Sequence, residues 1–155
     1  MADPKERSTL EEIALQLPGY SGYVRREARR DADRSARASL VESLKKAKDT
    51  VGRAKTKAAQ KGDLSALAPL ETLTDRLSRL VSKIGNADSG YTGFFDSGSV
   101  AEGTLESLCQ LDLALIEEAK GIAEAAAGAD PEALTGRLDG FEQEFDRRRS
   151  ILKGA

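Results

Sequence analysis

Hydrophobic residues recur along most of this chain at alternating steps of three and four, a spacing that places them on one face of an α-helix. Similar seams recur from about residue 37 to the end of the chain, whereas β-branched apolar residues are too few and too scattered to predict a sheet. The pattern therefore predicts an all-α protein. Its clearest seam consists of Arg37, Leu40, Leu44, Ala47, Val51, Ala54 and Ala58.

Capping and turn residues divide the pattern into separate helices. A capping box at 8–12 predicts a short first helix, Gly62 and Asp63 form a turn signal, and Asp130 followed by Pro131 is a strong start signal. Four long helices with mostly short connections favour an antiparallel up-and-down four-helix bundle with a short extra N-terminal helix. The expected helices span residues 8–16, 22–61, 64–84, 99–127 and 131–152, in a single domain over 8–155 that follows a flexible tail over 1–7.

Two short segments nearly repeat each other. Residues 19–23 and 90–94 both read glycine, tyrosine, hydroxyl residue, glycine, aromatic, and each precedes a long helical pattern. Paired glycines permit a tight turn, so the segments predict two similar corners, either by duplication or by local convergence on one turn type. Their aromatic side chains either form a core plug at one end of the bundle or an exposed patch. These side chains are Tyr20, Tyr23, Tyr91, Phe94 and Phe95.

Composition narrows the setting. The chain has 155 residues, no run of about 18 apolar residues and a single cysteine, Cys109. One cysteine excludes an internal disulfide and fits a reducing compartment, so we expect a cytoplasmic protein without a signal peptide. Cys109 lies in a leucine-rich run, which predicts a small core side chain. The abundance of Ala, Arg and Gly suggests a bacterial source.

Histidine is absent from the chain. Its absence excludes nucleophile systems with an imidazole base and the usual zinc and di-iron sites. The sequence also lacks a phosphate loop and a dinucleotide fingerprint. We therefore expect no metal, no cofactor and no catalysis. The alternative enzyme hypothesis is a site built from Asp33, Asp112 and a tyrosine.

Charge is distributed unevenly. The segment 23–61 carries thirteen basic and five acidic residues, a net charge of +8, so the remainder carries −10 in a chain of net charge −2. One interpretation is a basic face that attracts an anionic partner. The other is internal pairing with acidic neighbours. The acidic residues considered for that pairing are Glu71, Asp75, Glu117 and Glu118.

Charged residues also interrupt the apolar seams. Asp112 takes a seam position among leucines, where an unpaired carboxylate would be costly. Arg26, Arg29, Asp33 and Arg37 continue the seam of Leu40 toward the N-terminus. We therefore predict a buried, register-fixing ion pair between Asp112 and an arginine of the 22–61 helix. The residues assigned to this structural ion-pair group are Asp112, Arg30, Arg37 and Asp33, with Arg29 as a further candidate partner.

Together these features predict a non-catalytic interaction protein, such as an adaptor, scaffold subunit or regulatory partner, which could also form a homo-oligomer. The alternative is a peripheral protein that docks on anionic lipids through the basic helix 23–61. Nucleic acid is not an expected partner, because five of the seven aromatic residues lie in the corners and do not interleave with the arginines on an open platform. The candidate partner-binding residues are Tyr20, Tyr23, Arg25, Arg26, Arg29, Arg30, Tyr91, Phe94 and Phe95.

Overall fold

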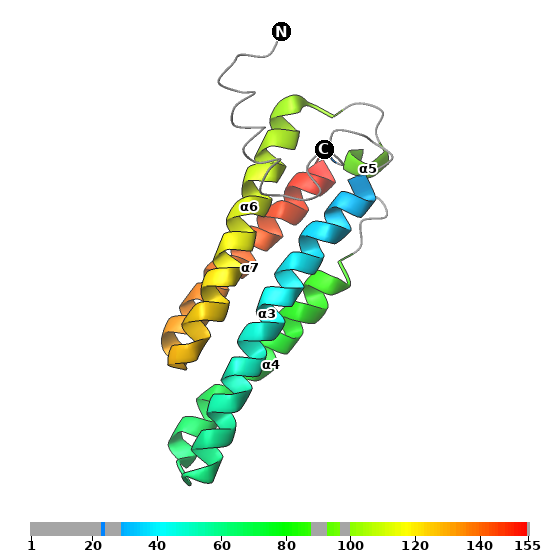
Figure 1. Cartoon of the computed structure of the whole chain (residues 1–155). Coiled ribbons are helices and arrows are strands. Elements are labelled where there is room, and N and C mark those ends of the chain that lie inside the picture. The colour runs from blue at the N-terminus through cyan, green and yellow to red at the C-terminus, as the bar shows by residue number, and fades with distance from the viewer. Residues whose placement is uncertain (1–22, 24–28, 88–92, 97–99, 155) are drawn as a thin grey trace. The chain divides into compact units, whose positions relative to one another are not determined.

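The chain folds as an all-α four-helix bundle, as predicted. The computed structural model describes residues 23, 29–87, 93–96 and 100–154, and no strand occurs in this part of the chain (Figure 1). The predicted tail over 1–7, the short first helix over 8–16 and most of both corners lie outside the described residues. The helices are α3 (Arg29–Gln60), α4 (Leu64–Gly85), the short α5 (Gly93–Asp96), α6 (Glu102–Ala125), the 3-10 helix η2 (Ala126–Gly128) and α7 (Pro131–Gly154).

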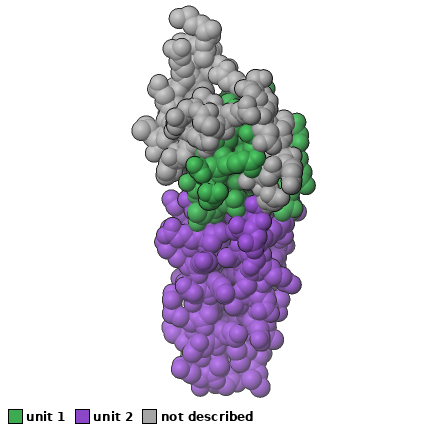
Figure 2. All heavy atoms as spheres, turned by 90° about the vertical axis from the view of Figure 1, so that its right-hand side faces the viewer, with its two compact units in different colours: residues 1–38, 88–116, 144–155 green, residues 39–87, 117–143 purple. Residues whose placement is uncertain are grey.

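The contacts divide the chain into two compact units, where the sequence predicted one domain (Figure 2). Unit 1 consists of residues 1–38, 88–116 and 144–155, and unit 2 consists of residues 39–87 and 117–143. The boundary falls within α3, α6 and α7, so each of these helices contributes to both units. Such a division is invisible in the hydrophobic pattern, which continues through the boundary.

Unit 2 contains parts of all four long helices around an apolar core. Helices α3 and α4 lie side by side in this unit and run antiparallel (Figure 1). Leucine, isoleucine and alanine dominate the core, as expected for helices that approach one another closely. The buried apolar residues are Leu40, Leu44, Ala47, Val51, Ala58, Leu70, Leu73, Leu77, Leu80, Ile84, Ala119, Ile122, Ala126, Leu134, Leu138 and Phe141.

The turn between α3 and α4 follows from its two central residues. Gly62 adopts a φ of 70°, which a glycine reaches without steric cost. The backbone N–H of Asp63 donates to the carbonyl of Ala58, and that of Gly62 donates to Ala59, the pattern of a Schellman motif. The carboxylate of Asp63 then accepts from the N–H of Ala66 and caps α4. The predicted turn at Gly62 and Asp63 is confirmed.

The connection from α6 to α7 combines the predicted cap with a left-handed residue that the sequence did not indicate. Asp130 caps α7 through the N–H groups of Glu132 and Ala133, as its sequence position predicted. The left-handed residue that ends η2 is Ala129, with a φ of 48°, rather than the neighbouring Gly128. An alanine in this conformation is strained by its Cβ atom.

Replacement of Ala129 by glycine is therefore expected to stabilise the protein. Relief of the left-handed strain raises the free energy of unfolding by about 1 kcal/mol. The greater conformational freedom of glycine in the unfolded chain offsets part of this gain. Urea denaturation followed by circular dichroism measures the change. Gly128→Ala serves as the neighbouring control. A lower free energy of unfolding for Ala129→Gly than for the wild type would contradict the prediction.

Unit 1 contains the start of α3, helix α5, the first part of α6 and the end of α7. Its core is richer in aromatic residues than that of unit 2. The buried apolar residues are Tyr23, Ala32, Ala36, Phe94, Phe95, Leu108, Cys109, Leu111, Leu115, Ile116, Phe145 and Leu152. None of the helices in the described ranges is both long and apolar enough to cross a membrane.

Candidate functional site

Three charged residues meet inside unit 1, and each comes from a different helix. Asp33 belongs to α3, Asp112 to α6 and Arg148 to α7, and all three are at most 2% exposed. Each occupies a seam position of its helix, where an apolar residue would normally pack. Because the seams of packed helices face one another, these side chains are brought together in the core.

Arg148 joins the two carboxylates. Its Nε donates to Oδ1 of Asp112, and its Nη2 lies 3.4 Å from Oδ2 of the same carboxylate. Nη2 also lies 2.7 Å from Oδ1 of Asp33, at an angle that does not make a hydrogen bond. The guanidinium of Arg148 therefore lies within ion-pair distance of both buried carboxylates.

Tyr23 and Arg37 complete this buried polar cluster. The hydroxyl of Tyr23 donates to Oδ2 of Asp112 at 2.8 Å and lies 3.2 Å from Nη2 of Arg148. Nε of Arg37 donates to Oδ2 of Asp33 at 3.0 Å. Two carboxylates thus face two guanidinium groups, so the cluster is electrically balanced, as buried charges in a protein core require.

The pKa directions agree with a structural role. Burial, followed by the charge of Asp112, raises the pKa of Tyr23 well above its ordinary value of 10.0. Burial alone would lower the pKa of Arg148, but the carboxylate of Asp112 and the other neighbours together raise it. Tyr23 therefore stays neutral and Arg148 stays charged at neutral pH. The enzyme hypothesis placed Asp33, Asp112 and a tyrosine together, and the structure does so, but with all three buried against Arg148.

The predicted partner of Asp112 was wrong. The sequence suggested Arg30, Arg37 or Arg29 of the 22–61 helix, whereas the ion pair is made with Arg148 of α7. Asp33 and Arg37 do take part in the cluster, but they pair with each other. Arg148 had a sequence signal, because it fills the one gap in the seam that runs through Phe145 and Leu152.

Of the five corner aromatic residues, the three that the structure describes, Tyr23, Phe94 and Phe95, pack together in the core. Phe94 packs edge-on against Tyr23 and Phe95, with ring centroids 5.8 Å and 5.3 Å apart. The guanidinium of Arg29 lies over the Phe94 ring and donates to the backbone carbonyls of Phe94 and Tyr23. The guanidinium of Arg30 lies 5.2 Å from the centroid of Phe95.

This packing changes the interpretation of the candidate partner-binding residues. Tyr23, Arg29, Phe94 and Phe95 are at most 3% exposed, so their side chains are not available to a partner in this conformation. Arg30 is half-buried. The other candidates, which are Tyr20, Arg25, Arg26 and Tyr91, lie outside the described residues.

Cys109 lies beside the polar cluster and is completely buried. Burial, followed by the charge of Asp112, raises its pKa from 9.0 to about 12. The folded protein therefore holds the thiol proton at a pH where the unfolded chain releases it. The raised pKa of Cys109 therefore contributes to the free energy of unfolding. This contribution is fully present below pH 9 and is lost as the pH rises toward 12.

Cys109→Ala is accordingly expected to weaken the alkaline loss of stability. Between pH 9 and pH 10 the free energy of unfolding of the wild type should fall by about 1 kcal/mol more than that of the variant. Urea denaturation at both pH values measures the two slopes. The small cavity left by the substitution does not depend on pH and cancels in the comparison. Equal slopes would contradict the raised pKa of Cys109.

Basic residues without ion-pair partners among the described residues lie around the exposed surface of α3. We define the α3 basic face as Lys45, Lys48, Arg53 and Lys57, together with Lys61 of the following turn. Four of the five are exposed and Lys48 is half-buried. Within the described residues, no carboxylate forms an ion pair with any of them.

The sequence suggested that acidic residues of the same chain neutralise the basic residues of α3. In the structure only some of these acidic residues form ion pairs with α3. Among the contacts of unit 2, Lys55 of α3 pairs with Glu71, whereas Glu118 pairs with Arg137. Carboxylates of α7 are likewise taken by α4, since Arg76 and Lys83 both bind Glu142. Internal pairing therefore explains part of the charge of α3 and leaves the α3 basic face without carboxylate partners among the described residues.

No group of histidine, cysteine and carboxylate residues in the described ranges could hold a metal ion. The described part of the chain thus contains a buried polar cluster and an exposed basic surface. Comparisons with protein families, curated proteins and solved structures found no match to this chain.

Proposed function

We propose that this protein is a non-catalytic interaction protein, acting as an adaptor, scaffold subunit or regulatory partner, and that it binds an anionic protein surface through the α3 basic face. The observation that carries the proposal is that five cations there have no carboxylate partner among the described residues, although carboxylates are plentiful elsewhere in unit 2. Exposed like charges attract an oppositely charged surface and accelerate its association.

The absence of an accessible reaction centre in the polar cluster supports a binding role over catalysis. Asp33, Asp112 and Tyr23 are occupied by one another and by Arg148, and each is at most 2% exposed. A catalytic group has to reach a substrate. The cluster therefore supports the architecture that presents the α3 basic face.

Docking on anionic lipids is the second candidate, since lipid headgroups would also attract the α3 basic face. A helix that lies on a membrane needs an apolar side that enters the boundary region. Among the described residues the exposed large apolar side chain is Leu64, in the first turn of α4. One leucine provides little apolar area, so we favour a protein partner.

A charge-reversal experiment tests the proposal. The tagged wild type is compared with Lys48→Glu/Arg53→Glu/Lys57→Glu, which reverses three charges of the α3 basic face. The matched control makes the same charge change elsewhere. It is Lys120→Glu/Arg149→Glu/Lys153→Glu, at exposed positions of α6 and α7. Circular dichroism establishes that all three proteins are folded.

We expect the wild type and the control to retain the same proteins of the source organism, and we expect the face variant to lose them. Their binding, once repeated with purified components, should weaken as salt is raised. Equal retention by the face variant and the wild type would contradict the proposal. Flotation of the wild type with phosphatidylglycerol vesicles, without a protein partner, would favour the membrane candidate instead.

A further inference from the structure

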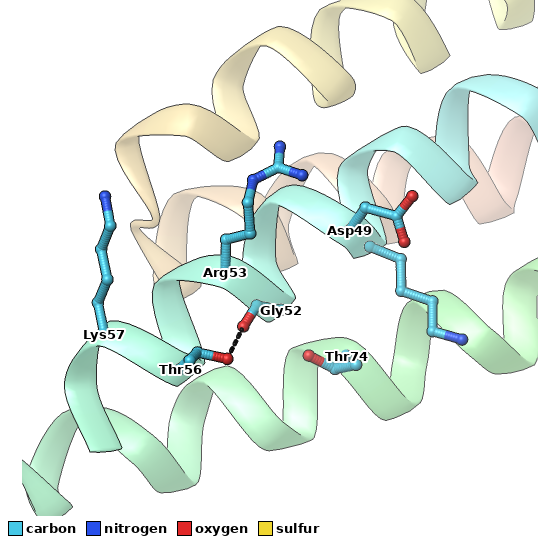
Figure 3. Close-up of a pocket in the computed structure, with 7 residues that line it drawn as sticks. Asp49, Gly52, Arg53, Thr56, Lys57 and Thr74 are labelled. Carbon is cyan, nitrogen blue, oxygen red and sulfur yellow. Dashed lines mark hydrogen bonds between the residues drawn. The ribbon is translucent and has the colours of Figure 1, made fainter. Parts of the chain in front are cut away.

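A hollow in unit 2 has the geometry that receives a side chain from another helix. Asp49, Gly52, Arg53 and Thr56 of α3 line it at positions i, i+3, i+4 and i+7 (Figure 3). Four residues at this spacing form the hole into which a knob of a facing helix inserts in coiled-coil packing. Thr74 of α4 also lines the hollow. This hole faces away from the buried seam of α3.

Gly52 provides the floor of the hole. A Cβ atom at this position would meet no heavy atom within 4 Å. Packing inside the described structure therefore does not require glycine, although glycine in a helix interior costs about 1 kcal/mol relative to alanine. Because glycine has no side chain, another chain can approach the helix closely at Gly52. Such an approach would explain why this position holds glycine.

The rim of the hole is basic. Lys48, Arg53 and Lys57 line the hollow with Asp49 as its single carboxylate, which leaves a net positive rim. The guanidinium of Arg53 donates from Nη2 to the hydroxyl of Thr50 at 3.0 Å, which helps to orient it. None of the three cations forms an ion pair with a described residue, so they remain available to an anionic partner.

The hydroxyl groups around the hole are already engaged. Thr56 donates to the backbone carbonyl of Gly52, as the dashed line in Figure 3 marks, and Thr74 donates to the carbonyl of Leu70. These threonines therefore contribute shape rather than free donors. The remaining donors are the cations of the rim, which favour carboxylate side chains.

We infer that the hole at Gly52 receives a side chain of an acidic helix of the partner protein, whose carboxylates pair with Lys48, Arg53 and Lys57. The inference rests on the proposed function and names the kind of partner. The spacing of the four residues selects a helix, and the rim selects negative charge. A membrane surface would use the same charges but would not depend on an open hole.

A peptide experiment separates the hole from the charge around it. The probe is a fluorescein-labelled, glutamate-rich peptide held helical by lactam bridges, titrated with the full chain at low salt. Gly52→Leu fills the hole without a change in charge. Gly140→Leu is the matched control, because Gly140 is an exposed glycine of α7 whose Cβ would also meet nothing within 4 Å.

We expect Gly52→Leu to weaken peptide binding about tenfold, because the leucine side chain would occupy the space that an inserted side chain needs. Gly140→Leu should bind the peptide as the wild type does. Equal binding by Gly52→Leu and the wild type would overturn the inference. If the triple charge reversal still abolished binding in that case, the proposed α3 basic face would stand without the hole.

Three further outcomes would also overturn the inference. The first is the absence of peptide binding by the wild type while phosphatidylglycerol vesicles bind it, which would assign the α3 basic face to a membrane. The second is self-association of the wild type, measured by sedimentation and abolished by Gly52→Leu, which would make a second copy of this chain the occupant. A natural partner that needs the α3 basic face but tolerates Gly52→Leu would preserve the proposed function alone.

Discussion

Replacement of Arg148 by methionine is expected to lower the free energy of unfolding by about 3–5 kcal/mol. Methionine keeps most of the volume but removes the guanidinium that faces Asp112 and Asp33. Both carboxylates would remain in the core, and Asp112 would retain only the hydroxyl of Tyr23 as its described hydrogen-bond donor. Urea denaturation at neutral pH measures the loss.

The neighbouring residue provides the control for Arg148. Arg149 is exposed, so Arg149→Met should change the free energy of unfolding by less than about 0.5 kcal/mol. The double variant Arg148→Met/Asp112→Asn should recover part of the loss, because it removes the carboxylate that Arg148→Met leaves without a guanidinium, whereas Asp33 keeps Arg37. Similar stabilities for Arg148→Met and Arg149→Met would show that the cluster is not a buried ion-pair network.

Tyr23→Ala should produce a loss of similar size, about 3–5 kcal/mol. The side chain is 2% exposed, its ring packs against Phe94, and its hydroxyl donates to Asp112. The substitution removes both the ring and the donor. Thermal and urea denaturation of the full chain measure the effect.

Tyr23→Phe divides that loss into its two parts. The ring is kept, so the cost should be about 1–3 kcal/mol, the penalty for removing the shorter of the two hydrogen bonds to Oδ2 of the buried Asp112 carboxylate. The folded pKa of Tyr23 is raised above 10.0, so the unfolded chain ionises first and stability falls as the pH rises beyond 10. That part of the alkaline loss should be missing in Tyr23→Phe. An unchanged slope above pH 10 would contradict the raised pKa.

Local signals explain why the helices were predictable. Gly62 with Asp63 and Asp130 with Pro131 determine their turns through backbone conformation and short-range hydrogen bonds. The left-handed residue after η2 was not predictable in the same way. Gly128 was available for it, yet Ala129 adopts the conformation. The division into two units also gave no signal, because the seams of α3, α6 and α7 continue across the boundary.

The polar cluster illustrates what a seam can and cannot specify. The sequence indicated that Asp33, Arg37 and Asp112 occupy core positions, because a charged residue at a seam position needs a partner. It predicted the wrong partner for Asp112, since a helical period gives the direction of a side chain around its own axis but not its level along a neighbouring helix. Arg148 is at the matching level, as the ion pair records.

By itself, the sequence determined the helical class, the positions of the long helices, the charged seam residues and the excess of basic residues in 23–61, because each depends on local spacing and residue type. Tertiary structure decided which side chains meet. It buried Tyr23, Arg29, Phe94 and Phe95, paired Asp112 with Arg148, and left Lys48, Arg53 and Lys57 without carboxylate partners among the described residues. The physical reason is that burial and pairing depend on the axial register of packed helices, which arises from all their contacts together.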